Sequence, residues 1–302
     1  MDGVALPSSG LPAGAGDACL FGLSLCSGVG GLDLGLHLAL PGYRTVGHVE
    51  RDAYAAAILV ARMEDAALDP APVWDDVGTF DGRPWRGAVD IVTAGYPCQP
   101  FSVAGKRRGA DDPRHLWPHV ARIVGEIEPP FVFLENVAHH LRLGFPDVAG
   151  GLVGMGYRLA AGLFTAAEVG APHRRERLFI LAIRERDHVA HPARLLGDAV
   201  ERRESDGVDA PLDDADGAGS QGRGDELDEY AGERPAWPPG PGDTDGWRAF
   251  LRHAPDLEPS FRRGADGLAH RVDRLRLCGN GVVPLVAAHA LRTLAAQLLA
   301  DG

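Results

Sequence analysis

The 302-residue sequence contains only four cysteines and no long hydrophobic run. The cysteines are scattered and form no CxxC pair, which excludes a disulfide-rich scaffold and argues against a structural zinc site. The longest apolar stretch, near residues 178–183, is far shorter than the ~20 residues that a membrane span requires. The N-terminus lacks the basic head of a signal peptide. We therefore expect a soluble intracellular protein.

The composition of the chain is that of an ordinary globular protein, with 45% hydrophobic and 24% charged residues. Its formal net charge is −12, which taken alone disfavours a nucleic-acid partner. However, residues 187–247 hold 16 acidic and 5 basic residues, so the rest of the chain is close to neutral. This Gly- and Pro-rich segment lacks apolar periodicity, and we interpret it as an exposed, partly disordered insertion. The net charge therefore neither supports nor excludes nucleic-acid binding.

Short apolar runs alternate with segments of helical spacing along most of the chain. This alternation predicts an α/β fold with a doubly wound sheet. In such sheets ligands bind at the carboxyl ends of the strands, and the unusual residues of this sequence fall there. Strands are predicted at 20–25, 43–49, 89–94, 131–134, 157–164 and 177–183, and helices after residue 31, at 52–63, at 116–127 and from Pro284 onward.

A glycine-rich turn, Ser-Gly-Val-Gly-Gly at residues 27–31, follows the first predicted strand. Its glycines let the backbone approach a bound ligand closely. Glu50 ends the next strand 20 residues after Gly30, where nucleotide-binding folds place a carboxylate on ribose hydroxyls. Asp76 follows a third segment and can accept a hydrogen bond from an adenine amino group. A purely structural turn with solvated acids is the alternative, and the lack of a P-loop lysine disfavours ATP hydrolysis.

Cys98 comes directly after the predicted strand at 89–94 and lies between Pro97 and Pro100. The two prolines stiffen the turn, so the thiol is presented at the ligand end of the sheet. A buried cysteine that serves only in packing is the alternative. The loop that follows, Gly-Lys-Arg-Arg-Gly at residues 105–109, is basic and can close over a polyanion, unless it is only a solvated charge run.

Five motifs of this sequence, in their order along the chain, resemble those of the DNA (cytosine-5) methyltransferases. The glycine turn resembles the first motif of that family, and residues 97–102 (Pro-Cys-Gln-Pro-Phe-Ser) resemble its catalytic motif. Residues 135–137 resemble the ENV motif, residues 170–177 the QxRxR element, and residues 279–284 the C-terminal motif. The resemblance covers most of the chain outside the acidic insertion. It implies a Rossmann-like S-adenosylmethionine-dependent methyltransferase sheet with a small target-recognition region.

The sequence departs from the family pattern at three positions. Ser24 and Cys26 stand where the family usually has Asp and Phe, which removes the aromatic wall expected against adenine. His173 replaces the usual Gln of the QxRxR element, while both arginines remain. None of these changes affects the sulfur of the catalytic motif.

The resemblance implies methyl transfer from S-adenosylmethionine to carbon 5 of cytosine in duplex DNA, through a covalent Cys98 adduct on a flipped base. Glu135, expected just after a buried strand, can hold the proton needed at N3 of the ring. Arg175 and Arg177 are two apart on a segment expected to be extended, so they point to the same side. One can contact cytosine O2 and the other can brace the thiolate or Glu135, and the resemblance assigns the base contact to Arg177.

The implied cofactor is S-adenosylmethionine and the implied partner is double-stranded DNA, with no metal and no membrane. We expect a monomeric cytoplasmic enzyme, bacterial or phage-encoded. The histidines are dispersed, and His139 and His140 are expected on the surface. Cofactor contacts are expected at Ser27, Gly28, Val29, Gly30, Glu50, Arg51, Asp76, Val77, Pro97, Asn280 and Val282, and contacts with DNA at Ser102, Lys106 and Arg107.

The expected organisation is a flexible tail at 1–17 and a catalytic domain at 18–186. A target-recognition region with the acidic insertion follows at 187–266, and the segment 267–302 completes the catalytic domain. A tRNA cytosine-5 methyltransferase is one alternative, although the Cys-Phe-Thr motif usual in that branch is absent. A catalytically silent DNA-binding module of the same fold is another, disfavoured by the intact Cys98, Glu135 and arginine pair. A cysteine hydrolase would leave the glycine turn and its acids unexplained.

Overall fold

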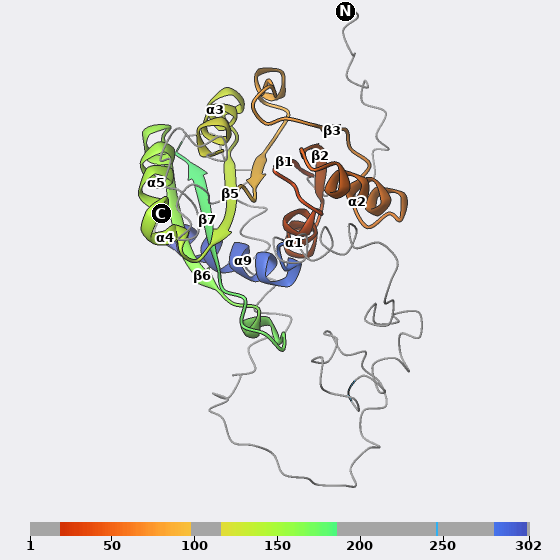
Figure 1. Ribbon diagram of the computed structural model, residues 1–302. Coiled ribbons are helices and arrows are strands. Elements are labelled where there is room, and N and C mark those ends of the chain that lie inside the picture. Colours follow the sequence, from red (N-terminus) through yellow and green to blue (C-terminus); the bar gives the residue numbers. More distant parts are fainter. Residues whose placement is uncertain (1–18, 98–115, 186–245, 247–280, 301–302) are drawn as a thin grey trace, which may run out of the picture.

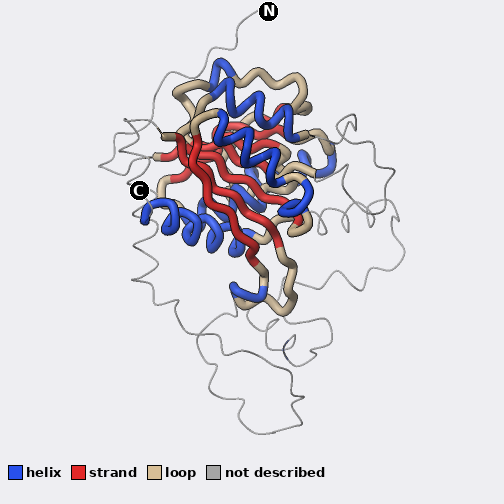
Figure 2. The backbone as a smooth tube through the Cα atoms, turned by 90° about the vertical axis from the view of Figure 1, so that its left-hand side faces the viewer, coloured by secondary structure: helices blue, strands red, loops and turns tan. Residues whose placement is uncertain are grey.

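The computed structural model describes residues 19–97, 116–185, 246 and 281–300. Within these ranges, seven strands form one sheet in the order β3-β2-β1-β4-β5-β7-β6, with helices on both faces (Figures 1 and 2), which confirms the predicted α/β doubly wound sheet. Strands β3, β2, β1, β4 and β5 are parallel, whereas β7 is antiparallel to both of its neighbours. The elements are β1 (Leu20–Leu25), α1 (Gly31–Ala39), β2 (Tyr43–Val49), α2 (Ala53–Glu64), β3 (Val73–Trp74), η1 (Arg83–Trp85), β4 (Ile91–Ala94), α3 (Trp117–Ile127), β5 (Phe131–Val137), α4 (His140–Leu143), α5 (Phe145–Gly154), β6 (Tyr157–Phe164), η3 (Ala167–Val169), β7 (Arg177–Arg184) and α9 (Pro284–Ala300).

Alternating residues of the central strands supply two apolar cores, one on each face of the sheet. In β5, Phe131 and Phe133 pack with residues of α1 and α9 on one face. The intervening Val132 and Leu134 pack with residues of α3 and α5 on the other. Burial of each such side chain contributes about 1.5–3 kcal/mol to stability, so an uninterrupted apolar strand is held firmly from both sides.

Helix α9 comes from the far end of the sequence and packs against α1, β6 and β7 (Figure 1). The approach of α9 to α1 is close at Gly35. A Cβ atom added to Gly35 would lie 2.6 Å from the Cβ of Ala287 and 2.8 Å from the carbonyl oxygen of Pro284. The two helices can therefore meet at this distance only because residue 35 has no side chain.

The carboxyl ends of the parallel strands lie at one edge of the sheet, which we call the site edge. Because β7 is antiparallel, it begins at this edge, and its connection from β6 projects past the rest of the sheet (Figures 1 and 2). The described site residues Gly28, Glu50, Asp76, Pro97, Glu135 and Arg177 all lie at or next to this edge.

Strand β5 and helix α5 differ most from their predictions. Strand β5 continues to Val137 rather than ending at residue 134, because Glu135 and Asn136 are buried polar residues with remote partners and still pair with β7. Helix α5 was not predicted, because its glycines are typical of a loop. One of them, Gly151, leaves room for the indole of Trp117, which a Cβ atom would approach to 3.1 Å.

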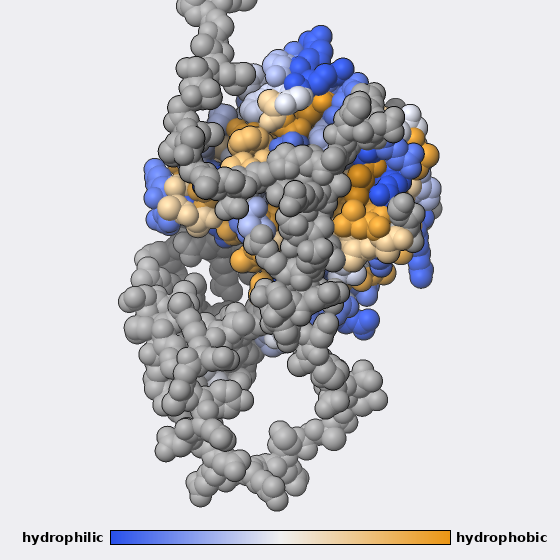
Figure 3. All heavy atoms as spheres, turned by 180° about the vertical axis from the view of Figure 1, so that it is seen from behind, coloured by the Kyte–Doolittle hydropathy of each residue, from blue (hydrophilic) through white to orange (hydrophobic). Residues whose placement is uncertain are grey.

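Apolar side chains also reach the surface of the described chain. Figure 3 shows hydrophobic residues toward the middle of one face, with hydrophilic residues around much of its edge. Among the exposed side chains are Leu38 of α1, Trp74 of β3 and Val153 of α5. Single exposed apolar side chains on separate elements are normal in folded proteins. In the described ranges, no helix is long and apolar enough to cross a membrane.

Candidate active site

Most of the predicted site residues lie in the described ranges and gather at the site edge. Pro97, three residues past the end of β4, is the last of the described residues before Cys98. Cys98, Ser102, Lys106, Arg107 and Asn280 lie outside the described residues, so their placement remains a prediction.

The glycine turn after β1 has a positive φ at Gly28 (55°) and at Gly30 (77°). Glycine adopts this region of φ without the steric cost that other residues have there. The amide of Gly30 donates to the carbonyl oxygen of Ser27 at 2.9 Å, which closes the turn. A Cβ atom on Gly28 would meet no described atom within 4 Å. The backbone at Gly28 therefore faces open space in which a ligand can lie.

Glu50 follows β2 and binds backbone N–H groups with both oxygens of its carboxylate. Its Oε2 accepts from the amide of Gly28 at 2.7 Å, and its Oε1 accepts from the amide of Asp52 at 2.7 Å. Burial raises the pKa of Glu50, although these hydrogen bonds oppose the rise. Glu50 thus joins the glycine turn to the start of α2. Its carboxylate also takes a backbone hydrogen bond from Arg51 and still keeps an acceptor position for a ligand hydroxyl.

Arg62 of α2 holds the same turn from its other side. Its Nη1 donates to the carbonyl oxygen of Val29. Burial lowers the pKa of the Arg62 guanidinium. The turn is therefore fixed by a carboxylate on one N–H group and a guanidinium on one carbonyl group. Sequence reasoning missed Arg62, because a helical arginine outside any motif is indistinguishable from a solvated one.

The two departures in β1 and the turn have different structural consequences. Ser24 donates from its hydroxyl to Oδ2 of Asp33 in α1 at 2.9 Å, so a carboxylate still lies at this position and is supplied by the helix. Cys26 is half-buried, and burial, with a smaller contribution from the charge of Glu50, raises the pKa of its thiol to about 12. Such a thiol stays protonated near neutral pH and is a weak nucleophile. Cys26 is therefore poorly suited to act as a nucleophile.

The segment after β3 carries two further predicted cofactor residues. Asp76 accepts a hydrogen bond from the amide of Gly78 at its Oδ1, at 2.8 Å. The side chain of Val77 is buried in the core, so a contact between Val77 and a cofactor would have to use its main chain. Arg51, at the end of β2, is exposed. Asp76 is thus the side chain of this segment that is placed to recognise a ligand.

The segment that leads to Cys98 is held through Tyr96. The Nδ2 of Asn136 donates to the carbonyl oxygen of Tyr96 at 3.1 Å, and the Tyr96 hydroxyl lies 3.2 Å from Nε2 of His140. His139 is exposed as predicted, but the prediction for His140 is wrong, because its side chain is only 4% exposed. Its burial against a tyrosine two residues before Cys98 could not be foreseen, since Tyr96 and His140 are far apart in the sequence.

Glu135 and Arg177 form an ion pair across β5 and β7, with 3.1 Å between Oε1 and Nε. Glu135 pairs in register with Phe179, so Arg177 is its diagonal neighbour on the same face of the sheet. Glu135 is only 6% exposed, and burial raises its pKa to about 7, more than Arg177 and Arg175 lower it. The prediction that Glu135 follows the strand is wrong, since it lies within the strand. The pair provides a buried acid that gains and loses its proton near neutral pH.

Arg175 and Arg177 do not share an extended segment, contrary to the prediction. Arg175 has a φ of 28°, so the chain turns before β7 begins. Its Nη2 donates to the carbonyl oxygen of Gly281, which joins the β6–β7 connection to the residues before α9. The positive charge of Arg175 still lowers the pKa of Glu135. The two arginines therefore converge on one carboxylate from different backbone geometries.

Val282 lies against the glycine turn, although the two are far apart in the sequence. A Cβ atom on Gly31, the first residue of α1, would overlap the carbonyl oxygen of Val282. The chain just before α9 therefore contacts the end of the glycine turn. Within the described ranges, no group of three or more His, Cys, Asp or Glu side chains could hold a metal ion.

The site edge thus combines two chemical settings. The ends of β1, β2 and β3, which we call the cofactor side, present a tight turn and two carboxylates, an arrangement suited to a nucleoside. The end of β5 and the start of β7, which we call the base side, present a buried acid next to a guanidinium. Such an acid can donate a proton or hydrogen bond to a ring nitrogen.

Comparison with known proteins agrees with this chemistry. A sequence model of one family, described as C-5 cytosine-specific DNA methylase, matches residues 21–210. The chain is 36% identical over 173 residues to the type II methyltransferase M.PspPI of Psychrobacter sp., covering 54% of this chain and 39% of that protein. It is 32% identical over 166 residues to the type II methyltransferase M.NgoMIV of Neisseria gonorrhoeae, covering 54% of this chain and 51% of that protein.

Among solved structures, the chain is similar to the Dnmt2 methyltransferase of S. pombe, with a TM-score of 0.47 and 22% identity. The matched part covers 56% of this chain and 52% of that one. The chain thus spans about two fifths to half of the length of the curated relatives named above.

Proposed function

Because the chain belongs to the C-5 cytosine-specific DNA methylase family, we propose that it transfers a methyl group from S-adenosylmethionine to carbon 5 of cytosine in duplex DNA. The observation that carries the proposal is the buried Glu135 beside Arg177. This pair lies at the same edge of the sheet as the glycine turn and the segment that leads to Cys98.

The cofactor side fits S-adenosylmethionine, which supplies an electrophilic methyl group when it is bound. No described atom crowds the backbone at Gly28, and Glu50 can accept hydrogen bonds from the ribose hydroxyls. Asp76 can accept from the adenine amino group. The remaining predicted contacts with the cofactor are Ser27, Val29, Gly30, Arg51, Val77, Pro97, Asn280 and Val282.

Cys98 acts as the nucleophile in this proposal. Carbon 5 of cytosine is a poor nucleophile, so the thiolate first adds to carbon 6 and makes carbon 5 electron-rich. After carbon 5 gains the methyl group, a base takes its proton and the electrons of that C–H bond expel the thiolate from carbon 6, while the N3 proton returns to Glu135; these steps restore the aromatic ring. Asn136 and His140 support this step by holding Tyr96 and with it the start of the Cys98 segment.

Glu135 supplies the proton that the ring needs at N3 as the thiolate adds. A pKa of about 7 leaves a large fraction of Glu135 protonated near neutral pH, which suits a general acid. Arg177 holds the carboxyl group in place and can also contact cytosine O2. Fixed donors of this kind typically stabilise developing charge by a few kcal/mol each.

Neither Glu135 nor Cys98 can reach a cytosine that is stacked inside a duplex, so the proposal includes base flipping. Flipping costs a few kcal/mol, which contacts with the pocket and the DNA backbone offset. Ser102, Lys106 and Arg107 are the proposed phosphate contacts. The acidic part of residues 187–266 is expected to point away from the DNA, since phosphates repel it.

Bisulfite sequencing of DNA from cells that express this chain tests the proposal and reports the methylated sequence. We expect C5-methylated cytosines at a recurring site, and none in cells that express the Cys98→Ser variant. Unmethylated DNA together with methylated tRNA would favour an RNA substrate instead. DNA binding without methylation of either would favour the silent module.

A further inference from the structure

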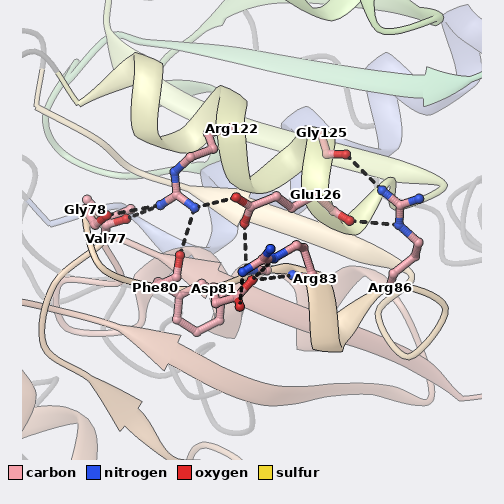
Figure 4. A network of polar contacts seen from close by, with 10 residues as sticks. Val77, Gly78, Phe80, Asp81, Arg83, Arg86, Arg122, Gly125 and Glu126 are labelled. Atoms are coloured by element: carbon pink, nitrogen blue, oxygen red, sulfur yellow. Dashed lines mark hydrogen bonds and ion pairs between the residues drawn. The ribbon is translucent and has the colours of Figure 1, made fainter.

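The segment from Asp76 to Gly82 is bound by one arginine of α3 (Figure 4). The Nη2 of Arg122 donates to the carbonyl oxygen of Val77 at 3.0 Å and to that of Gly78 at 3.4 Å. Its Nη1 donates to the carbonyl oxygen of Phe80 at 2.9 Å. One guanidinium therefore binds three backbone carbonyl oxygens within the four residues that follow Asp76.

Glu126, one helical turn after Arg122, completes this contact. Its Oε1 accepts from Nη1 of Arg122 at 2.7 Å, and its Oε2 accepts from the amide of Gly82 at 2.8 Å. The two side chains thus bind both the carbonyl groups and an N–H group of the segment. Charge-assisted hydrogen bonds in a fixed fork give geometric definition as well as attraction.

Asp76 is oriented by the same backbone. Its Oδ1 accepts from the amide of Gly78, while no described residue donates to its Oδ2. Val77 and Phe80, whose carbonyl groups Arg122 binds, also anchor the segment through side chains buried in the core. Any shift of the Val77 carbonyl therefore moves Asp76, which precedes it in the chain.

We propose that Arg122 and Glu126 are positioning residues for adenine, because they fix the Asp76–Gly82 segment so that Asp76 can accept from the 6-amino group of the cofactor. This inference rests on the proposed function. Neither residue touches the cofactor, and both act through the segment that carries Asp76. α3 thereby controls which purine the cofactor side accepts.

The test measures the dissociation constants of the full chain for S-adenosylhomocysteine and for its analogue that lacks the 6-amino group. Calorimetric titration gives both constants, and their ratio reports recognition of the amino group. We expect the unmodified protein to prefer the amino form by about tenfold or more, the usual effect of losing a hydrogen bond to a charged partner. The variant Asp76→Ala gives the value of this ratio when the amino group is not recognised.

In Arg122→Met we expect the ratio to fall to within about threefold of its value in Asp76→Ala, since the carboxylate is no longer held in place. Arg158→Met is the matched control. Arg158 of β6 also binds a backbone carbonyl, that of Leu298, at 2.6 Å, and this contact involves neither the Asp76–Gly82 segment nor Arg122 and Glu126. We expect this control to keep the ratio of the unmodified protein.

Two milder variants keep the test decisive if Arg122→Met does not fold. Arg122→Lys keeps the charge but not the fork, and Glu126→Gln keeps the shape but not the charge, so both should lower the ratio by about half of the full effect on a logarithmic scale. An unchanged ratio in every folded variant would overturn the positioning role alone. Failure of the unmodified protein to bind S-adenosylhomocysteine would overturn both this role and the proposed function.

Discussion

On the cofactor side of the site edge, Glu50, Arg62 and Arg122 bind backbone groups, whereas on the base side Glu135 and Arg177 bind each other. The first arrangement fixes loops, since each charge satisfies main-chain groups that would otherwise be free to shift. The second leaves a carboxyl group whose protonation can change, because its burial opposes the charged form. Under the proposed function, the first side is suited to holding the cofactor and the second to transferring a proton.

Replacement of Cys98, the proposed nucleophile, should have the largest effect and should affect catalysis without affecting cofactor binding. Cys98→Ser should abolish methyl transfer while leaving the affinity for S-adenosylhomocysteine within about twofold, because the serine hydroxyl is a much weaker nucleophile of similar size. Transfer is measured with a labelled methyl group, and DNA that contains 5-fluorocytosine should cross-link to the unmodified chain but not to the variant. Full activity in the variant, or a cross-link that forms without the sulfur, would refute the covalent mechanism.

Removal of the buried acid should affect the base side alone. Glu135→Gln should lower kcat by about 10²- to 10³-fold, since the amide cannot give up a proton to N3, and should change DNA affinity much less. Single-turnover rates and filter binding on the same oligonucleotide measure the two quantities. Equal losses in rate and in DNA affinity would mean that Glu135 binds the base and does not act as a proton donor.

Removal of Glu50 should affect only the cofactor side. Glu50→Ala should weaken cofactor binding by about ten- to a hundredfold, because it deletes ribose contacts and releases the amide of Gly28. At saturating cofactor, kcat should stay within about threefold of the unmodified value. The control Arg292→Met removes a similar bond to the opposite end of α1, from Arg292 to the carbonyl of Leu38, and should change neither quantity. A large fall in kcat at saturation would break the division between the two sides.

The smallest expected effect concerns stability and pH. The pKa of Glu135 is about 7 in the folded protein and is lower when the chain is unfolded, so the folded state binds the extra proton. The free energy of unfolding should therefore fall as pH rises above the unfolded pKa and through about 7, with about 1 kcal/mol of this fall between pH 6 and pH 8. Glu135→Gln cannot ionise and should lack this term. Urea unfolding of both proteins at each pH measures it, and parallel curves would contradict the raised pKa.

Much of the fold was predictable from sequence because the central strands are short, mostly apolar runs that alternate with segments of helical spacing. The exceptions have physical reasons. The end of β5 was placed too early because Glu135 and Asn136 are polar residues whose partners, Arg177 and Tyr96, are remote in sequence. The direction of β7 was also not predicted, since a period of two residues is the same in parallel and antiparallel strands.

Residues of the candidate site could be predicted only where they belong to a recognisable motif or follow a strand at a characteristic spacing. Glu50 and Asp76 follow strands at recognisable spacings, and Glu135 belongs to a short motif. Arg62 and Arg122 have no such mark, because an arginine that binds a backbone carbonyl of a distant loop has the same local sequence as one in solvent. Arg175 was misplaced because its positive φ depends on the turn before β7, not on its own residue type.

Helix α9 is held against the sheet by side-chain packing with elements that are distant in the sequence. It packs against α1 at Gly35, and Val282, just before the helix, contacts the glycine turn. The preceding strand of the described chain, β7, ends at Arg184. Cutting the polypeptide between these two elements would break no described strand pairing. Two co-expressed fragments, one ending after β7 and one starting before α9, should therefore associate and restore the cofactor side. We expect this association only if residue 35 remains a glycine.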